Sequence, residues 1–592
     1  MTHPMTEKQP IIEIKDISFR YPGAEYESLQ HVNLTINKGD FIAIIGSNGS
    51  GKSTLCKCFN GLIPTYYAGD LEGSVMINGL STQSTSIAEL SKHVAYVFQD
   101  FENQLVRPTV YDEVCFAPLN FGYEDYKERG MNALRMLEIE DIQHKWIWQL
   151  SGGQKHMTAL AAALSLEPDI IIVDEPVAQL DPAHARLIYE KLKLLNEKYN
   201  KTIIVIEHHT EYIADYCTNV MLMEAGGKVR WIKPVKEGLS SVDELASLHI
   251  QPPQVTQAFH SLREKIVPTT QTMYPITIKE AALALQQSAL PYTKPRHVAI
   301  EEQYKQSEEH SDRPVLLKFD NVVSGYQSMD RNQKPTLQNI NLEMHEGQRI
   351  ALIGNNGAGK STLLRLIAGI RKPWEGSVTV CGKNTSQTSP EQLSDLVSFI
   401  FQNPEEMFIS DNIRADIEFF LKARKQTNIE PFIDHIMDTF NLTELQQRDG
   451  RLLSGGQQRR ATLAIGMAMK PTIMLLDEPT ASLDIASRRE MTRLFDELRD
   501  HVKAIVVATH DMQLVADWAT RVIVMHEGRI IMDTNSRDVF QHEHILKLAA
   551  LIPPQIVELS HYANITPPCL SVAEFITHIE SIIPQEVYSG VN

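Results

Sequence analysis

The sequence predicts an α/β protein made of two tandem copies of one domain, each with an inserted helical subdomain and a small C-terminal extension. A glycine-rich loop of the form G-x-x-x-x-G-K-[ST] occurs twice, in FIAIIGSNGSGKST at 41–54 and in RIALIGNNGAGKST at 349–362. The pentapeptide LSGGQ also occurs twice, at 150–154 and 453–457. Apolar runs such as IIIVDE and TIIVIE alternate with amphipathic stretches, which is typical of buried parallel strands separated by helices.

The duplication covers most of the chain at nearly constant spacing. IIIVDEP at 170–176 matches IMLLDEP at 473–479, and VIEHH at 205–209 matches VVATHD at 506–511. Beyond these motifs, LASLHIQPPQV is echoed by LAALIPPQIV, which indicates a repeated extension. We expect domains at 1–235 and 314–537, extensions at 236–289 and 538–592, a polar, charged linker at 290–313, and helical subdomains at 120–148 and 412–447.

Each glycine-rich loop follows an apolar strand and opens a helical stretch, which is the setting of a phosphate-binding loop. Glycines let backbone N–H groups wrap around phosphate oxygens, and the helix N-terminus adds positive potential. The lysine then reaches the β- and γ-phosphates, and the serine hydroxyl binds Mg²⁺. The predicted loop residues are Gly46, Ser47, Asn48, Gly49, Ser50, Gly51, Lys52, Ser53 and Thr54, and Gly354, Asn355, Asn356, Gly357, Ala358, Gly359, Lys360, Ser361 and Thr362.

Two adjacent carboxylates end a predicted strand in each half. Asp174 and Asp477 are expected in the Mg²⁺ shell, as the acidic residue of such sites is. Glu175 and Glu478 follow directly, and because a strand alternates its faces they need not bind the metal and can instead polarise the water that attacks the γ-phosphate. The chain is therefore predicted to use ATP and Mg²⁺.

With LSGGQ, five motifs occur in the same order in both halves, and the chain resembles the nucleotide-binding domains of ATP-binding-cassette (ABC) proteins, a type of P-loop NTPase. The resemblance implies two composite ATP sites, in which the LSGGQ of one half grips the γ-phosphate held by the other. It assigns Gln99 and Gln402 to catalysis and the Mg²⁺ shell, and His208 and His510 to γ-phosphate contact. The residues it assigns to nucleotide binding are Ser151, Gly152, Gly153, Gln154, Ser454, Gly455, Gly456 and Gln457, with Tyr21 and Tyr326 stacking on adenine.

The segment after each glutamine resembles the ATPases of energy-coupling-factor importers. It reads FQDFENQLVRPTVYDEVCFAPLN at 98–120 and FQNPEEMFISDNIRADIEFFLKA at 401–423. The first copy departs from that family's pattern at Asp100 and Phe101, and the second at Met407. The resemblance implies an energy-coupling subunit for a vitamin, such as a thiamine precursor, or a metal ion. It would act at the cytoplasmic face of the membrane with an integral coupling subunit and a membrane substrate-binding subunit.

Composition and charge bear on the alternatives. The net charge of −18 argues against a nucleic-acid binder. The start, MTHPMTEKQP, has no signal-like pattern and no stretch approaches roughly 18 consecutive apolar residues, which predicts a cytosolic chain. A sugar-type importer ATPase and a soluble ribosome-associated translation ATPase stay open, although the first often loses site residues and the second carries a long basic linker. The sequence names neither the cargo nor the membrane partners.

The two halves differ after LSGGQ. LSGGQQRRATLA at 453–464 corresponds to LSGGQKHMTALA at 150–161, so that His156 and Met157 replace two arginines. Because LSGGQ itself is intact in both halves, we expect both sites to bind ATP and to differ in their rates of hydrolysis.

Overall fold

The computed structural model places the chain in two units, Met1–Leu290 and Pro291–Asn592, which are described separately. It describes residues 9–177, 180–263, 273–287, 313–326, 335–481, 483, 485–499 and 501–582. Apart from its last residue, the predicted linker at 290–313 lies outside these residues.

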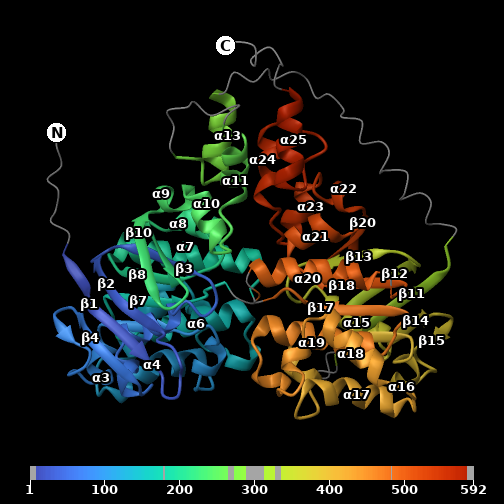
Figure 1. Cartoon of the computed structure of the whole chain (residues 1–592), viewed down its shortest axis with the longest axis horizontal. Helices are drawn as coiled ribbons and strands as arrows, with labels where there is room; N and C mark the ends of the chain where they lie inside the picture. Colours follow the sequence, from blue (N-terminus) through green and yellow to red (C-terminus); the bar gives the residue numbers. More distant parts are fainter. Residues whose placement is uncertain are drawn as a thin grey trace. The chain divides into compact units, whose positions relative to one another are not determined.

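Each unit contains one mainly parallel sheet and one antiparallel sheet (Figure 1). In unit 1 the parallel sheet has the order β10 (Lys228–Pro234), β9 (Asn219–Glu224), β3 (Phe41–Gly46), β8 (Thr202–Ile206), β7 (Ile170–Asp174) and β6 (Val94–Val97). Only β10 runs antiparallel to its neighbour. The antiparallel sheet has the order β2 (Leu29–Asn37), β1 (Pro10–Arg20), β4 (Asp70–Ile77) and β5 (Leu80–Ser81).

Unit 2 repeats this topology strand for strand, which confirms the predicted α/β duplication. Its parallel sheet has the order β16 (Val397–Ile400), β17 (Ile473–Asp477), β18 (Ala504–Thr509), β13 (Arg349–Ile353), β19 (Arg521–His526) and β20 (Arg529–Thr534). Its antiparallel sheet has the order β12 (Pro335–His345), β11 (Val315–Gly325), β14 (Glu375–Val380) and β15 (Lys383–Asn384).

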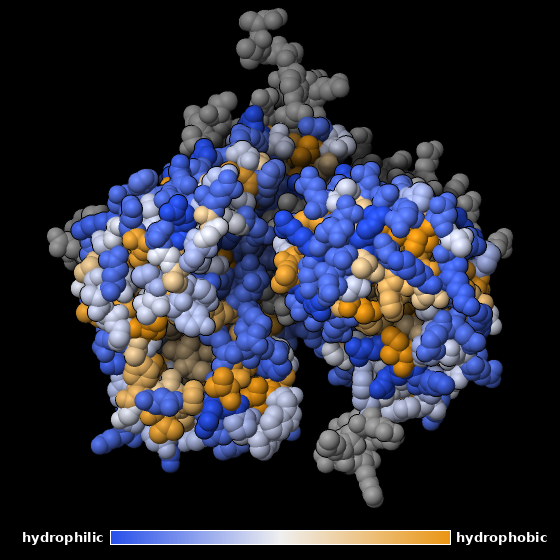
Figure 2. Space-filling view, turned by 60° about the horizontal axis from the view of Figure 1, so that its bottom comes forward, coloured by the Kyte–Doolittle hydropathy of each residue, from blue (hydrophilic) through white to orange (hydrophobic). Residues whose placement is uncertain are grey.

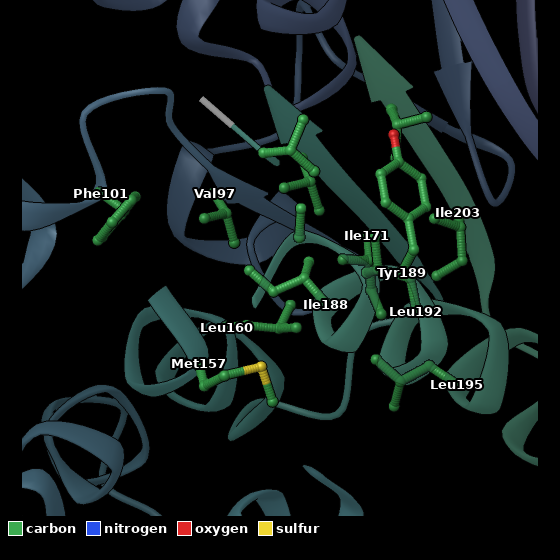
Figure 3. Close-up of a cluster of buried hydrophobic side chains, with 14 of the residues drawn as sticks. Val97, Phe101, Met157, Leu160, Ile171, Ile188, Tyr189, Leu192, Leu195 and Ile203 are labelled. Atoms are coloured by element: carbon green, nitrogen blue, oxygen red, sulfur yellow. The ribbon is translucent and has the colours of Figure 1, made fainter. Parts of the chain in front are cut away.

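The central strands are apolar throughout because both faces of the parallel sheet are covered. In β3 of unit 1, Ile42 and Ile44 pack toward the antiparallel sheet and α1 (Lys52–Phe59). Ala43 and Ile45 point to the opposite face, which α6 (Gly152–Leu164) and α7 (Pro182–Tyr199) cover. Figure 3 shows part of this second cluster, where side chains from α6 and α7 meet those of the sheet. The strand ends that carry the site are therefore fixed by two cores.

The inserted helical subdomain of unit 1 begins earlier than the predicted 120–148. It contains α4 (Val110–Asn120), which ends where the predicted segment begins, and α5 (Tyr126–Leu137). Pro118 inside α4 conceals this helix in the sequence, but the Thr109 hydroxyl caps its start by accepting a hydrogen bond from the Asp112 N–H. In unit 2 the insert contains α17 (Ile413–Ala423) and α18 (Glu430–Thr439), within the predicted 412–447.

The C-terminal extensions are helical, as predicted. Unit 1 carries α9 (Val235–Ser240), α10 (Val242–Ser247), α11 (Gln254–Ser261) and α13 (Ile278–Gln287), and unit 2 carries α22 (Ser536–Val539), α23 (Glu543–Leu548), α24 (Gln555–Tyr562) and α25 (Val572–Ile582). In each unit the extension lies at the end opposite to the inserted helices (Figure 1). Among the described residues, none of the helices has the length and apolar character needed to cross a membrane.

Candidate nucleotide-binding and catalytic sites

The phosphate loop of unit 1 joins β3 to α1. Gly51 has a φ of 89°, and a Cβ there would lie 2.4 Å from the Ser28 carbonyl oxygen, so only glycine fits this turn. The buried Lys52 Nζ donates to the carbonyl oxygens of Gly46 at 2.9 Å and Ser47 at 3.0 Å. The loop therefore fixes the ammonium group at its centre, where it can meet a phosphate.

The loop of unit 2 joins β13 to α15 (Lys360–Ile367) and has the same construction. Gly359 has a φ of 105° and a Cβ there would lie 2.6 Å from Leu337 Cδ2. Lys360 Nζ donates to the carbonyl oxygens of Gly354 at 2.6 Å and Asn355 at 3.3 Å. Both predicted loops are thus placed at the start of a helix, as the motif requires.

Each loop serine is joined to the aspartate that ends β7 or β17, which is the pair expected to bind Mg²⁺. Ser53 hydrogen-bonds to Asp174, and Ser361 hydrogen-bonds to Asp477. Burial raises the pKa of both carboxyl groups, because a buried negative charge is unfavourable. A bound cation would compensate this charge. Asp477 Oδ1 is buried without a hydrogen-bond partner, and a hard, oxygen-seeking cation would satisfy it. This donor set of one carboxylate and one hydroxyl suits Mg²⁺ held jointly by protein and phosphates.

Three predicted catalytic residues come together in unit 1. Gln99 Nε2 donates to Glu175 Oε2 at 2.6 Å, and His208 Nε2 lies 3.3 Å from Glu175 Oε1. Glu175 has a φ of 50°, although it is not glycine. Such backbone strain gathers at functional positions, where the surrounding structure enforces it. The β7 turn thus holds the carboxylate beside the glutamine and histidine.

Unit 2 places its glutamate differently. Glu478 also has a positive φ, of 47°, but it is buried and pairs with His510 Nδ1 at 3.0 Å and Lys360 Nζ at 3.6 Å. Burial alone would raise the pKa of Glu478, but His510 and Lys360 outweigh burial and lower it. Gln402 is fastened through its backbone, because Arg459 Nη2 donates to its carbonyl oxygen at 2.6 Å. The same sequence motifs therefore produce two different arrangements around the carboxylates predicted to be catalytic.

The LSGGQ residues lie at the start of α6 and of α19 (Gly455–Ala468), on different elements from the strands that carry the carboxylates. Ser151 and Gln154 form a capping box, with Gln154 N–H donating to Ser151 Oγ at 3.3 Å and Ser151 N–H donating to Gln154 Oε1 at 3.2 Å. Ser454 N–H donates likewise to Gln457 Oε1 at 3.1 Å. These reciprocal bonds hold the hydroxyl and the glycine N–H groups at a helix N-terminus, which favours an anion.

The two aromatic residues predicted to stack on adenine lie beside their loops. The Tyr21 hydroxyl lies 3.4 Å from Thr54 Oγ1, and the Tyr326 hydroxyl lies 3.5 Å from Thr362 Oγ1. The guanidinium of Arg371 covers one face of the Tyr326 ring, at 3.8 Å from its centroid. A purine stacking on Tyr326 would therefore use the other face or displace this arginine.

Two buried residues of unit 1, Tyr96 and Glu207, bond to candidate site residues and were not predicted from the sequence. The Tyr96 hydroxyl donates to Asp174 Oδ2 at 2.9 Å, where unit 2 has Phe399. Glu207 Oε1 accepts the backbone N–H groups of His208 at 2.7 Å and His209 at 2.9 Å. The difference between IEHH in this half and ATHD in the other could have revealed Glu207. A glutamate at the end of an apolar strand is rarely buried unless it has partners, so its presence there predicts hydrogen bonds.

Fold and site together define a P-loop ATPase with two tandem domains. The family model described as ABC transporter matches residues 29–178 and 337–481. A relative from Methanosarcina mazei is 32% identical over 569 residues, 96% of this chain and 96% of its own. Another, from Caldanaerobacter subterraneus subsp. tengcongensis, is 32% identical over 578 residues, 97% of this chain and 99% of its own. Both are named as ABC transporter ATP-binding proteins, and this chain belongs to that family.

Among solved structures, cbiO1 from Clostridium perfringens is 29% identical, with a TM-score of 0.37. The match covers 43% of this chain and 100% of that one, which is described as part of the ABC transporter complex cbiONQ.

Proposed function

We propose that the chain is the energy-coupling ATPase of an importer of the energy-coupling-factor type, for a vitamin or a metal ion. In this proposal it binds an integral coupling subunit, which works with a membrane substrate-binding subunit at the cytoplasmic face. The segment that follows each catalytic glutamine carries the proposal, since its letters resemble the corresponding segment of these ATPases. The other candidate residues act in ATP binding and hydrolysis as assigned above.

The inserted helical subdomains support a docking role, because each exposes large apolar side chains. In unit 1 the rings of Trp146 and Trp148 stack at 4.5 Å, and the Trp148 residue is 66% exposed. In unit 2, Phe419 of α17 is 49% exposed, and Ile409 and Leu452, which flank the insert, are 58% and 84% exposed. Figure 2 turns the end of the molecule with the inserted helices forward and shows apolar surface in both units. Apolar surface gathered in this way is typical of a binding site for another protein.

Affinity purification of the full chain from a detergent extract tests this function. The expected result is recovery of integral membrane subunits together with a bound small molecule, and their loss in the Trp148→Glu variant. Tyr26→Glu, which changes an aromatic residue that is 74% exposed at the turn after β1, is the matched control and should retain them. Recovery of ribosomes or of non-membrane partners alone would contradict the importer assignment.

We further propose that the LSGGQ of each unit completes the ATP site of the other. This pairing is tested by combining substitutions from the two units and comparing the single-turnover hydrolysis rates of the double and single variants. Ser454→Arg should remove the turnover left in Glu478→Gln, since that variant relies on the site containing Lys52. The same substitution should add little to Glu175→Gln, in which this site is already silent. Equal additional losses in both backgrounds would contradict the pairing.

A further inference from the structure

The segment that carries the catalytic glutamine has the same backbone plan in both units but is fastened by different side chains. In unit 1 it runs from β6 into a short 3-10 helix, Phe101–Gln104, and in unit 2 from β16 into Pro404–Met407. Aligning FQDFENQ with FQNPEEM pairs Gln104 with Met407, and aligning the two LSGGQ helices pairs His156 with Arg459. In each pair only one residue forms hydrogen bonds to the glutamine segment, and it belongs to a different unit each time: Gln104 in unit 1 and Arg459 in unit 2.

In unit 1 the side-chain amide of Gln104 closes the segment on itself. Its Nε2 donates to the Tyr96 carbonyl oxygen at 3.0 Å, and its Oε1 accepts the Phe98 N–H at 2.9 Å. These two bonds fix the backbone immediately before Gln99. Met407, at the corresponding position of unit 2, offers only a thioether, which is a weak acceptor and donates nothing.

In unit 2 the fastening comes from α19 instead. Arg459 is buried, and its guanidinium donates from Nη1 to the Phe401 carbonyl oxygen at 3.1 Å and from Nη2 to the Gln402 carbonyl oxygen. The negative charges of Glu478 and Asp477 attract this cation, which places it beside the catalytic carboxylates as well as the glutamine. Charge-assisted hydrogen bonds of this kind are the stronger ones.

The counterpart of Arg459 in unit 1 makes no such bonds. His156 is buried, both of its ring nitrogens are without a hydrogen-bond partner, and its imidazole stacks on Phe101 at a centroid distance of 4.4 Å. Phe101 stands where unit 2 has Pro404. In this unit, therefore, the LSGGQ helix meets the glutamine segment through an apolar ring stack.

We propose that Gln104 and Arg459 are positioning residues with the same task, which is to hold Gln99 and Gln402 at their ATP sites. The inference rests on the site assignment proposed above. The two arrangements should respond differently when the LSGGQ helix moves. In unit 2 the glutamine is bonded to the helix that begins with LSGGQ, so a movement of that helix pulls directly on it. In unit 1 the glutamine is bonded to its own segment, and the same movement reaches it only through the His156–Phe101 stack.

The test uses single-turnover hydrolysis and MgATP binding in the full chain, with the other catalytic glutamate changed to glutamine. Gln104→Met is measured in a Glu478→Gln background and Arg459→Met in a Glu175→Gln background. Each should slow hydrolysis about 10-fold and leave the Kd for MgATP within about 2-fold, because one set of backbone hydrogen bonds is lost and the nucleotide contacts are kept. Arg459→Lys, which keeps the positive charge but has a single donor nitrogen in place of two, should fall between Arg459→Met and the parent.

A transplant distinguishes positioning from a general loss of structure. Phe101→Pro, Gln104→Met and His156→Arg combined give unit 1 the unit 2 pattern and should recover most of the rate lost in Gln104→Met. Gln458→Met, next to Arg459, removes a side-chain donor to the Arg451 carbonyl oxygen and should change the rate less than 2-fold. Failure of the transplant with unchanged melting temperature, or an equal loss in Gln458→Met, would overturn the inference.

Gln402→Ala separates this inference from the function on which it rests. If Gln402→Ala slows hydrolysis but Arg459→Met does not, Arg459 has no positioning role and the site assignment stands. If Gln402→Ala leaves hydrolysis unchanged, the site assignment itself is wrong, and the inference fails with it.

Discussion

The buried imidazole of His156 should make unit 1 lose stability in acid. Burial lowers the pKa of this histidine from 6.5 to about 4, and both ring nitrogens are without hydrogen-bond partners. The unfolded chain therefore binds the proton more readily than the folded one. The contribution of His156 to the free energy of unfolding is full above about pH 6.5 and falls as the pH drops toward 4. Between pH 7 and pH 5 the loss is about 2 kcal/mol.

The perturbation is His156→Phe, which keeps an aromatic ring against Phe101 and removes the titrating group. Urea unfolding at pH 7 and pH 5 should show that acidification costs the variant about 2 kcal/mol less than the parent chain in the transition of unit 1. Phe101→Leu, which keeps the imidazole and removes its stacking partner, should retain the full acid sensitivity of the parent. Equal acid sensitivity in His156→Phe and the parent would refute the reasoning.

Three further predictions concern packing, charge and metal. Gly153→Ala should lower the melting temperature, because a Cβ there would lie 2.3 Å from the His184 ring, whereas Gly455→Ala meets nothing within 4 Å and should be neutral or stabilising in the same melting scan. Arg537→Ala loses hydrogen bonds to the partly exposed Glu574 and to a carbonyl oxygen, and should lower the free energy of unfolding in urea by about 1–2 kcal/mol. Lys236→Ala, which breaks an exposed ion pair, should lower it by less than about 0.5 kcal/mol. Removing Mg²⁺ with EDTA should abolish phosphate release in a malachite-green assay, with restoration by added Mg²⁺, and undiminished hydrolysis in EDTA would contradict the proposed metal pairs.

Much of the fold could be predicted because the motifs carry their own structural setting. A loop that needs glycine at a positive φ, as Gly51 does, can be recognised from its letters alone. The carboxylates at 174 and 477 end strands whose apolar runs mark them as buried. The strand-end location of Glu175 and Glu478 was likewise readable, although their strained backbone was not.

The rest depended on tertiary contacts that a linear pattern does not contain. Replacement of Arg459 by His156 was visible, but its meaning required knowing that the arginine reaches two carbonyl oxygens almost sixty residues earlier. The partner of Glu207 was equally hidden, since the Tyr189 hydroxyl that bonds it comes from α7, 18 residues away along the chain. Pro118 concealed α4 for a local reason, because a helix interior usually excludes proline.

Covalent fusion of the two copies has a consequence for how this ATPase can change. In an assembly of identical subunits, a substitution changes the same position of every subunit, and so every site, at once. Here Glu207 stands where the other copy keeps Thr509, and Tyr96 where the other keeps Phe399. A single gene can thus adjust one of the two proposed ATP sites and leave the other untouched.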